Sequence, residues 1–193
     1  MNSVQPPTGA TAAPSGARLL RTASVLAGVA LLLSVSWGGY RLWNGAPYPE
    51  VDPNVVAMRL REQAERVEED LEGRSRFEAR PVDTGACSYR GLRSFAHVDE
   101  ARRDVRSFDV DWSTTGVARD TARAGQDRIR NRLSQQGWKP AGEHPSGMGF
   151  RFEHPGTGDR VDVGWYAETG TLAVSIYAPC GQVPDGFDAQ APA

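Results

Sequence analysis

A run of nineteen uncharged and mostly apolar residues at positions 22–40, TASVLAGVALLLSVSWGGY, constrains this chain more than any other feature. A helix of this length, at about 1.5 Å per residue, approaches the roughly 30 Å thickness of the hydrocarbon core of a bilayer. Arginines flank the run at positions 18, 21 and 41, and three aromatic residues gather at its C-terminal end: Trp37, Tyr40 and Trp43. The sequence therefore predicts a transmembrane helix over residues 18–41 that contacts lipid through residues 22–40.

The charges on either side of this run predict its orientation. Residues 1–49 contain no Asp or Glu, whereas Glu50 and Asp52 follow soon after the run. By the positive-inside rule, the N-terminus lies in the cytoplasm and the C-terminal domain is extracellular, so we expect a single-pass protein of the cell membrane. A cleaved signal peptide is the alternative. The small residues that would mark a cleavage site, at 34–38, lie inside or against the run, which favours a retained signal anchor.

The composition of the remaining segments predicts how the chain is divided. Residues 1–17 consist mainly of Pro, Gly, Ala, Ser and Thr, which is typical of a disordered tail, here a cytoplasmic one. We expect a linker over residues 42–51, one extracytoplasmic α+β domain over residues 52–180 and a flexible tail over residues 181–193. The net charge of −2 provides no basic face, so a nucleic-acid partner is not expected.

Two stretches of the domain have the spacing of amphipathic helices. Asp52 and Pro53 form a typical helix start, an N-cap followed by a proline in the first turn. Apolar residues then recur on one helical face: Val56, Leu60, Ala64, Val67 and Leu71. A second stripe comprises Val117, Thr121, Ala122, Gly125, Ile129 and Leu133. We expect Thr114 or Thr115 to cap this second helix and Gly137 to end it.

Alternating apolar and polar residues predict the strands. Phe108, Val110 and Trp112 alternate with two aspartates before the second helix, and three further alternating stretches follow it, at residues 150–153, 161–166 and 172–176. Short turns separate the last three strands, which indicates an antiparallel meander. Together these elements predict a two-layer α+β domain with the order α-β-α-β-β-β and both helices on one face of an antiparallel sheet. Residues 86–92 are a candidate for an additional edge strand.

The chain contains two cysteines, Cys87 and Cys180. In an exported domain an even number of cysteines is typical of disulfide bonding, and the absence of a CxxC motif favours a structural bond over a catalytic one. Two free thiols are the alternative. A bridge would join the start of the domain to its last strand, and the chain-entropy description assigns about 4–5 kcal/mol to a loop of this order as an upper value.

The sequence Glu-His-Pro occurs twice, at residues 143–145 and 153–155, and an aspartate follows the second copy. Imidazole and carboxylate groups are common ligands of zinc and manganese, so the candidate metal ligands are Glu143, His144, Glu153, His154 and Asp159. Neighbouring residues on a strand point to opposite faces, however, and the prolines favour loop positions, so the simpler interpretation places these residues in ordinary turns. We therefore expect no metal site and no cofactor.

Asp109 and Asp111 place two carboxylates on one face of a strand, about 7 Å apart, an arrangement that can support acid–base chemistry at glycosidic bonds. Solvent-facing residues of an amphipathic strand have the same pattern, and we favour this simpler explanation. The sequence lacks the GxSxG and SxxK nucleophile motifs, and it has no helix with two histidines four residues apart. We therefore assign no catalytic residue.

Four residues at the predicted end of the second helix and a proline–cysteine pair after the last strand carry a resemblance: Arg132, Leu133, Gly137 and Trp138, and Pro179 and Cys180. In this layout the chain resembles single-pass, membrane-anchored envelope proteins of streptomycete-like actinobacteria, which are themselves uncharacterised. The resemblance covers most of the exported part. It implies a bacterial membrane-anchored protein and assigns no catalytic residues.

These observations favour a membrane-anchored, non-catalytic binding or accessory domain of unidentified ligand, with the bilayer and an envelope protein as expected partners. Such a domain should have no deep polar cleft. The alternative is a cell-surface metal-dependent hydrolase that uses the His144/His154 region, and it requires at least three of the candidate ligands to converge. A ligand-sensing domain is a third hypothesis, which the short cytoplasmic tail disfavours.

Overall fold

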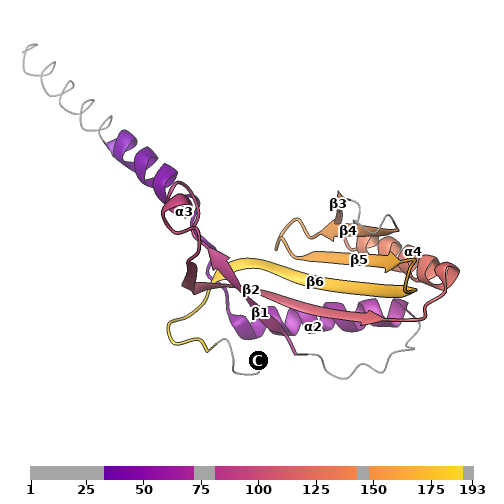
Figure 1. Ribbon diagram of the computed structural model, residues 1–193. Coiled ribbons are helices and arrows are strands. Elements are labelled where there is room, and N and C mark those ends of the chain that lie inside the picture. Colours follow the sequence, from indigo (N-terminus) through magenta and orange to yellow (C-terminus); the bar gives the residue numbers. More distant parts are fainter. Residues whose placement is uncertain (1–32, 72–80, 143–147, 189–193) are drawn as a thin grey trace, which may run out of the picture.

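An open antiparallel sheet of six strands organises the described part of the chain, and two long helices pack against it (Figure 1). The computed structural model describes residues 33–71, 81–142 and 148–188. The strands follow the order β1-β2-β6-β5-β4-β3 across the sheet. Their bounds are β1 Asp83–Ser88, β2 Ala101–Thr114, β3 Lys139–Gly142, β4 Gly149–Glu153, β5 Arg160–Tyr166 and β6 Thr171–Gln182. The helices are α2 Pro53–Asp70, α3 Arg93–Ala96 and α4 Arg119–Gln135.

The two faces of the sheet differ because side chains alternate along each strand. On one face the aligned residues Val110, Ile176 and Val161 are at most 1% exposed. Leu60 of α2 and Ile129 of α4 belong to the same buried cluster, so both helices cover this face. The other face is polar and carries Asp109, Asp111, Arg151, Asp162 and Tyr177.

The predicted α+β fold with an antiparallel sheet is confirmed, and the sheet is larger than expected. Two short edge strands, β1 and β3, extend the predicted four strands on either side. The edge strand predicted over residues 86–92 begins earlier, at Asp83, and ends at Ser88. Strand β3 was not predicted, because its sequence KPAG has no alternation. It forms through pairing with β4, where Lys139 lies opposite Glu153.

The first helical stripe is confirmed, and the second is confirmed for Ala122, Gly125, Ile129 and Leu133, whereas Thr121 is exposed and Val117 precedes the helix. Only one of the two predicted caps is confirmed. Asp52 caps α2, because its Oδ1 accepts the N–H of Asn54 at 2.9 Å. Strand β2 continues through Thr114, so neither predicted threonine caps the next helix, and α4 begins without a side-chain cap. Gly137 follows this helix as predicted, with a φ of 84° that favours glycine.

The chain after residue 180 is more closely packed than predicted. Strand β6 continues to Gln182, and the next residue, Val183, is 5% exposed. The ring of Phe187 packs edge-to-face on Phe108 of β2, with ring centroids 6.1 Å apart. The domain therefore extends beyond residue 180, where the sequence predicted its end, because apolar side chains after that residue pack beside the core. The last five residues lie outside the described residues.

Within the described part of the chain, no helix combines the length and the apolar character that crossing a membrane requires. Residues 33–44 are helical and include the C-terminal part of the predicted span. Residues 22–32, and with them the predicted tail over residues 1–17, lie outside the described residues. The transmembrane helix over residues 18–41 therefore stays a prediction.

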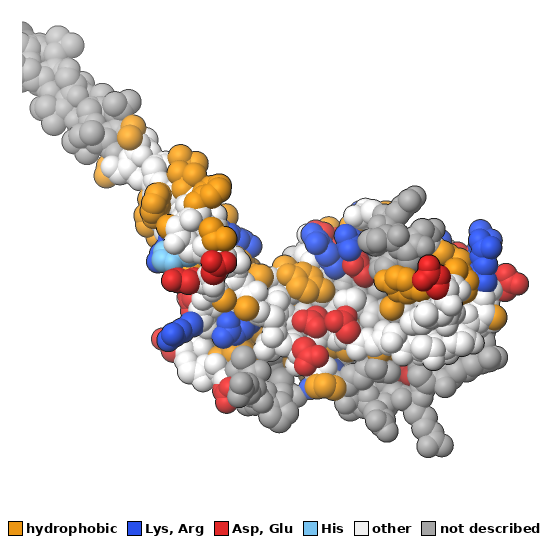
Figure 2. Space-filling model, in the orientation of Figure 1, with side chains coloured by type: hydrophobic (Ala, Val, Ile, Leu, Met, Phe, Trp, Pro, Cys, Tyr) orange, Lys and Arg blue, Asp and Glu red, His pale blue; other side chains and the backbone are white. Residues whose placement is uncertain are grey.

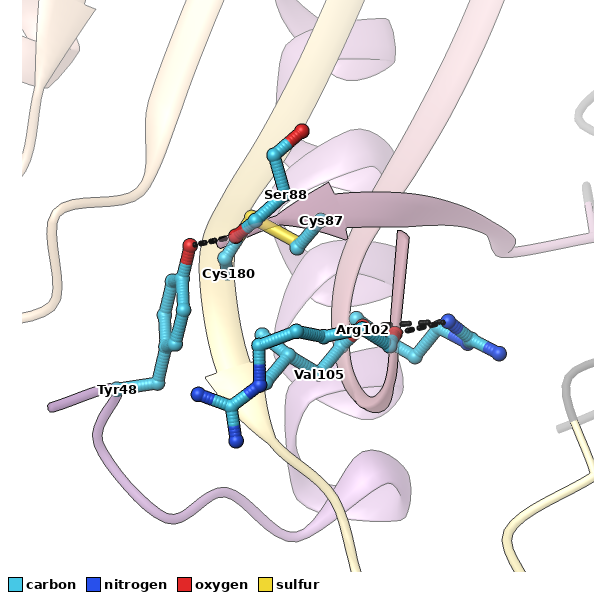
Figure 3. Close-up of a disulfide and its surroundings, with 7 residues drawn as sticks. Tyr48, Cys87, Ser88, Arg102, Val105 and Cys180 are labelled. Atoms are coloured by element: carbon cyan, nitrogen blue, oxygen red, sulfur yellow. Dashed lines mark hydrogen bonds between the residues drawn. A yellow bond between two sulfur atoms is a disulfide. The ribbon is translucent and has the colours of Figure 1, made fainter. Parts of the chain in front are cut away.

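The segment predicted as a linker, residues 42–51, is bound to the domain. The hydroxyl of Tyr48 donates a hydrogen bond to the carbonyl oxygen of Ser88 at 2.8 Å (Figure 3). The guanidinium of Arg90 lies over the Tyr48 ring, 3.7 Å from its centroid. Residues 42–51 and the β1–β2 connection, residues 89–100, thus form one unit, which we call the helix junction.

Candidate functional site

A cleft of about 350 Å³ lies between helix α2 and the turn that joins β4 to β5. This volume is within the range of about 300–1,000 Å³ that is typical of small-molecule sites. The polar and aromatic side chains of its lining are Arg59, Gln63 and Arg66 from α2, Trp138 from the segment after α4, and His154 and Asp159 from the β4–β5 turn. Leu60 and Ile176 add apolar surface.

The wall formed by α2 follows from the helical repeat. Arg59, Gln63 and Arg66 are spaced by four and three residues, which places them on one side of the helix. The neighbouring stripe faces the sheet, and Leu60 and Ala64 are at most 1% exposed. The wall therefore lies where the buried face of α2 meets its exposed face.

An ion pair between Arg59 and Asp159 joins the two walls of the cleft. The Nε of Arg59 donates to Oδ2 of Asp159 at 2.6 Å, and Nη2 donates to Oδ1 at 2.9 Å. Two parallel bonds of this kind fix the orientation of a guanidinium. The side chain of Asp159 is only 4% exposed, so the buried carboxylate depends on this cation for its stability.

Local hydrogen bonds hold the β4–β5 turn in shape. The N–H of Gly158 donates to the carbonyl oxygen of His154 at 2.8 Å, and its φ of 73° favours glycine. The N–H of Thr157 donates to Nδ1 of His154 at 3.2 Å, so the neutral imidazole carries its proton on Nε2. The same ring contacts Trp138 edge-to-face, with centroids 5.2 Å apart. The imidazole of the turn and the indole of Trp138, from the segment after α4, thus lie together on the cleft wall.

Gln63 has hydrogen-bonding capacity that the described residues do not use. The residue is 8% exposed, and its amide nitrogen Nε2 is buried without a hydrogen-bond partner in the described part of the chain. A buried donor without an acceptor destabilises a fold by about 1–3 kcal/mol. Gln63 also lines the cleft, so a rotation of its side chain would bring this donor to an oxygen atom of a bound molecule or of water. This makes Gln63 a candidate ligand-binding residue.

Arg66 contributes a cation that is held less firmly. It pairs with Glu62, one turn earlier on the same helix, and its side chain is 44% exposed. Exposed pairs of this kind contribute little to stability, about 0–1 kcal/mol. A ligand anion can therefore replace Glu62 at small expense in folding energy.

The charged lining of the cleft differs from the expectation of a domain without a deep polar cleft. Its two walls are far apart in the sequence, since Arg59 and Asp159 are separated by 100 positions, and they meet only in the folded chain. The ion pair in the cleft reduces this departure from the expectation. Arg59 and Asp159 neutralise each other, so the cleft does not present an isolated buried charge.

The candidate metal ligands are not gathered in the described part of the chain. No group of three or more His, Cys, Asp or Glu side chains among these residues is arranged to hold a metal ion. The three that are described have separate partners: Glu153 binds Arg160 at 2.9 Å, His154 binds Thr157, and Asp159 binds Arg59. Glu143 and His144 lie outside the described residues. The hydrolase hypothesis therefore stays a prediction.

Asp109 and Asp111 lie on the open face of the sheet, as expected for an amphipathic strand. Partial burial, followed by the negative charges of Asp111 and Asp83, raises the pKa of Asp109 to about 6. The folded chain then holds this proton more tightly than the unfolded chain does. The contribution of Asp109 to stability therefore falls as the pH rises from 3.8 toward 6. We assign this pair no binding function.

Cys87 and Cys180 form the predicted disulfide (Figure 3). Their Cα atoms are 6.2 Å apart, and the bond spans 93 positions. It joins β1 to β6, which are not neighbours because β2 lies between them. The bond is therefore structural: it fastens an edge strand, together with the adjoining helix junction, to the strand at the centre of the sheet.

The sequence analysis did not identify the three site residues of α2, and it named Trp138 only at the predicted end of the second helix. A signal was present for Gln63, which follows Leu60 by three residues and precedes Val67 by four. A glutamine at that position lies within the inner stripe, where a polar residue is unusual. For Arg59 and Arg66 the pattern indicates only an exposed helical face.

The cleft thus combines apolar surface, an unpaired buried donor, an aromatic pair and an exposed cation. This set of groups suits recognition of a small molecule that has both an apolar body and an oxygen acceptor. A comparison with protein-family models, with curated proteins and with solved structures finds no match for this chain.

Proposed function

We propose that this chain is a membrane-anchored, non-catalytic binding protein whose extracytoplasmic domain holds a small ligand in the cleft between α2 and the β4–β5 turn. The observation that carries this proposal is the buried, unpaired amide of Gln63. Without a ligand this donor lowers the stability of the fold, and a ligand oxygen would remove that penalty.

The lining indicates the chemical class of the ligand. The amide nitrogen of Gln63 requires an oxygen acceptor, and the exposed guanidinium of Arg66 favours a negative charge. Leu60 and Trp138 favour an apolar or planar body. These requirements together describe a small carboxylate with an apolar part, such as an acylated amino acid or an aromatic acid.

The pairing of the cleft residues supports binding rather than reaction. Both carboxylate oxygens of Asp159 accept hydrogen bonds from Arg59, and Nδ1 of His154 accepts the N–H of Thr157. These groups are occupied in holding the walls together. We accordingly propose an accessory role in which the loaded domain serves an envelope protein partner.

The proposed location has two supports. The apolar run over residues 22–40 is long enough to anchor the chain, and the flanking arginines favour a cytoplasmic N-terminus. The disulfide between Cys87 and Cys180 is typical of proteins that fold in an oxidising compartment, outside the cytoplasm.

Calorimetric titration of the full chain in lipid nanodiscs tests the proposal. The probes are N-acetylphenylalanine and indole-3-carboxylate, each compared with its uncharged amide. We expect the carboxylates to bind more tightly than the amides. Gln63→Met should weaken carboxylate binding by about tenfold, the equivalent of one hydrogen bond of about 1.4 kcal/mol.

Gln126→Met is the matched control. Gln126 is 2% exposed, but its amide donates to the carbonyl oxygen of Met148 at 3.3 Å, and it does not line the cleft. This variant should bind the probes as the unaltered chain does. Equal binding by Gln63→Met and the unaltered chain, or no binding of any probe, would refute the proposed role of the cleft.

A further inference from the structure

The β1–β2 connection carries large apolar side chains that the fold leaves exposed. Phe95 is 79% exposed, Val98 is 73% exposed and Leu92 is 43% exposed. None of the three belongs to the core cluster of the domain. We call these residues the α3 tip, because they lie in or beside the short helix α3. Apolar residues gathered on an exposed loop are typical of an interaction surface.

The α3 tip is held against the C-terminal end of the helix formed by residues 33–44. The N–H of Leu92 donates to the carbonyl oxygen of Leu42 at 3.1 Å. Two glycines allow this approach: a Cβ atom on Gly91 would lie 2.7 Å from that same carbonyl oxygen, and one on Gly45 would lie 2.7 Å from the N–H nitrogen of Gly91. Both glycines have positive φ values, 65° and 72°. Backbone contacts therefore fix the position of the α3 tip along the axis of the helix.

The helix itself is apolar on its surface, and the α3 tip continues that surface. Its exposed apolar side chains include Leu33, Val35, Trp37, Tyr40, Leu42 and Trp43. Figure 2 shows hydrophobic side chains gathered along the protruding helix and at its base, where it meets the domain. The patch is therefore continuous with the C-terminal end of the apolar run over residues 22–40.

Arginines and aromatic rings alternate around this patch. Three guanidinium groups lie over rings: Arg41 over Trp37 at 4.7 Å, Arg90 over Tyr48 at 3.7 Å and Arg93 over Tyr89 at 4.7 Å. Asp99 and Glu100 lie in the same connection, and Glu100 pairs with His97 at 2.6 Å. Arginine and aromatic side chains at the end of an apolar helix are typical of the headgroup level of a bilayer.

We propose that the α3 tip docks on the lipid bilayer, with Phe95 and Val98 inserted at the headgroup level beside the end of the anchoring helix. This inference rests on the proposed membrane anchoring. Two contacts, the helix and the tip, then fix the orientation of the domain on the membrane surface. A single span joined to the domain by a free linker would leave that orientation undetermined. Here the helix junction binds the helix to the domain, so the orientation of the helix also sets the orientation of the sheet.

Depth-dependent fluorescence quenching tests this docking on the full chain. A genetically encoded coumarin amino acid replaces Tyr40, Phe95 or Tyr166 in turn, and the chain is reconstituted in phosphatidylcholine vesicles with a minority of phosphatidylglycerol. Brominated lipid of the same headgroup is the quencher. Tyr40 reports anchoring, Phe95 reports docking, and Tyr166, an exposed residue at the end of β5 farthest from the helix, is the negative control (Figure 1).

We expect strong quenching at positions 40 and 95 and little at position 166. With the coumarin moved to Val98, Phe95→Asp should reduce quenching to the level of position 166, because a carboxylate resists insertion. Quenching at position 40 without quenching at position 95 would overturn the docking and leave the anchoring intact. A second copy of the chain that covered the tip would give that same result. Absence of quenching at all three positions would overturn both the membrane anchoring and the docking of the α3 tip.

Discussion

The helix junction and the cleft use similar side chains in opposite ways. At the junction, the hydroxyl of Tyr48 is bonded to the backbone of Ser88, and Arg90 covers its ring. The disulfide lies directly beside this contact (Figure 3). In the cleft, Arg59 is also paired, but the amide of Gln63 has no partner in the described part of the chain. The polar groups of the junction therefore bind neighbouring parts of the chain, whereas the Gln63 amide of the cleft is left unpaired.

This difference indicates that the junction mainly stabilises the fold and that the cleft is the better candidate for ligand binding. A buried donor is normally paired because an unpaired one destabilises the fold. When one region pairs its polar groups and another leaves a donor unpaired beside a hollow, the second region is the better candidate for binding. Three sets of variants test this contrast, and their expected effects on stability decrease from the disulfide through the ion pair to the buried glutamines.

The largest effect should come from the disulfide, which lies beside the helix junction. Replacing both Cys87 and Cys180 with serine should lower the free energy of unfolding by about 2–5 kcal/mol, because the bond closes a loop across 93 positions. Guanidinium denaturation of the full chain, followed by tryptophan fluorescence, measures the change. Reductant should shift the midpoint of the unaltered chain and leave that of the double variant in place. Equal midpoints for the two chains in oxidising buffer would show that the disulfide does not stabilise the fold.

An intermediate effect should come from the ion pair of the cleft. Asp159→Asn should lower the free energy of unfolding by about 1–3 kcal/mol, because asparagine can accept only one of the two bonds from Arg59 and carries no charge to compensate the guanidinium. Asp162→Asn is the matched control, since Asp162 pairs with Arg151 on the open face, where the side chains are 22% and 36% exposed. Its loss should stay below about 1 kcal/mol. If both variants lose the same amount in parallel melts, burial does not distinguish the two pairs.

The smallest effect should come from the two buried glutamines in the absence of ligand. Gln63→Met removes an unpaired donor and should leave the stability unchanged or raise it by up to about 1 kcal/mol. Gln126→Met removes a donor that is bonded to Met148 and should lower the stability by about 1 kcal/mol. Differential scanning calorimetry of the three chains compares them. A loss at Gln63 as large as that at Gln126 would mean that the cleft amide is structural.

The elements that could be predicted are those that local pattern specifies. Leu60, Ala64 and Val67 recur with the 3.6-residue period of a helix and share its buried face. Phe108 and Val110 alternate with polar residues and share the buried face of a strand. Strand β3 escaped prediction because pairing with β4, rather than its own sequence, makes it a strand. The cap of α4 was misplaced because β2 extends through Thr114, a length set by its pairing with β6.

The sequence by itself determined the apolar run at 22–40, the two amphipathic helices, the central strands and the pair of cysteines, because each depends on spacing along the chain or on residue type. Only the tertiary structure decided the cleft and the α3 tip. Arg59 meets Asp159 across 100 positions, and Gly45 meets Gly91 across the helix junction. Such contacts form when packing of the core brings distant parts of the backbone together. The spacing of residues along the sequence therefore does not predict them.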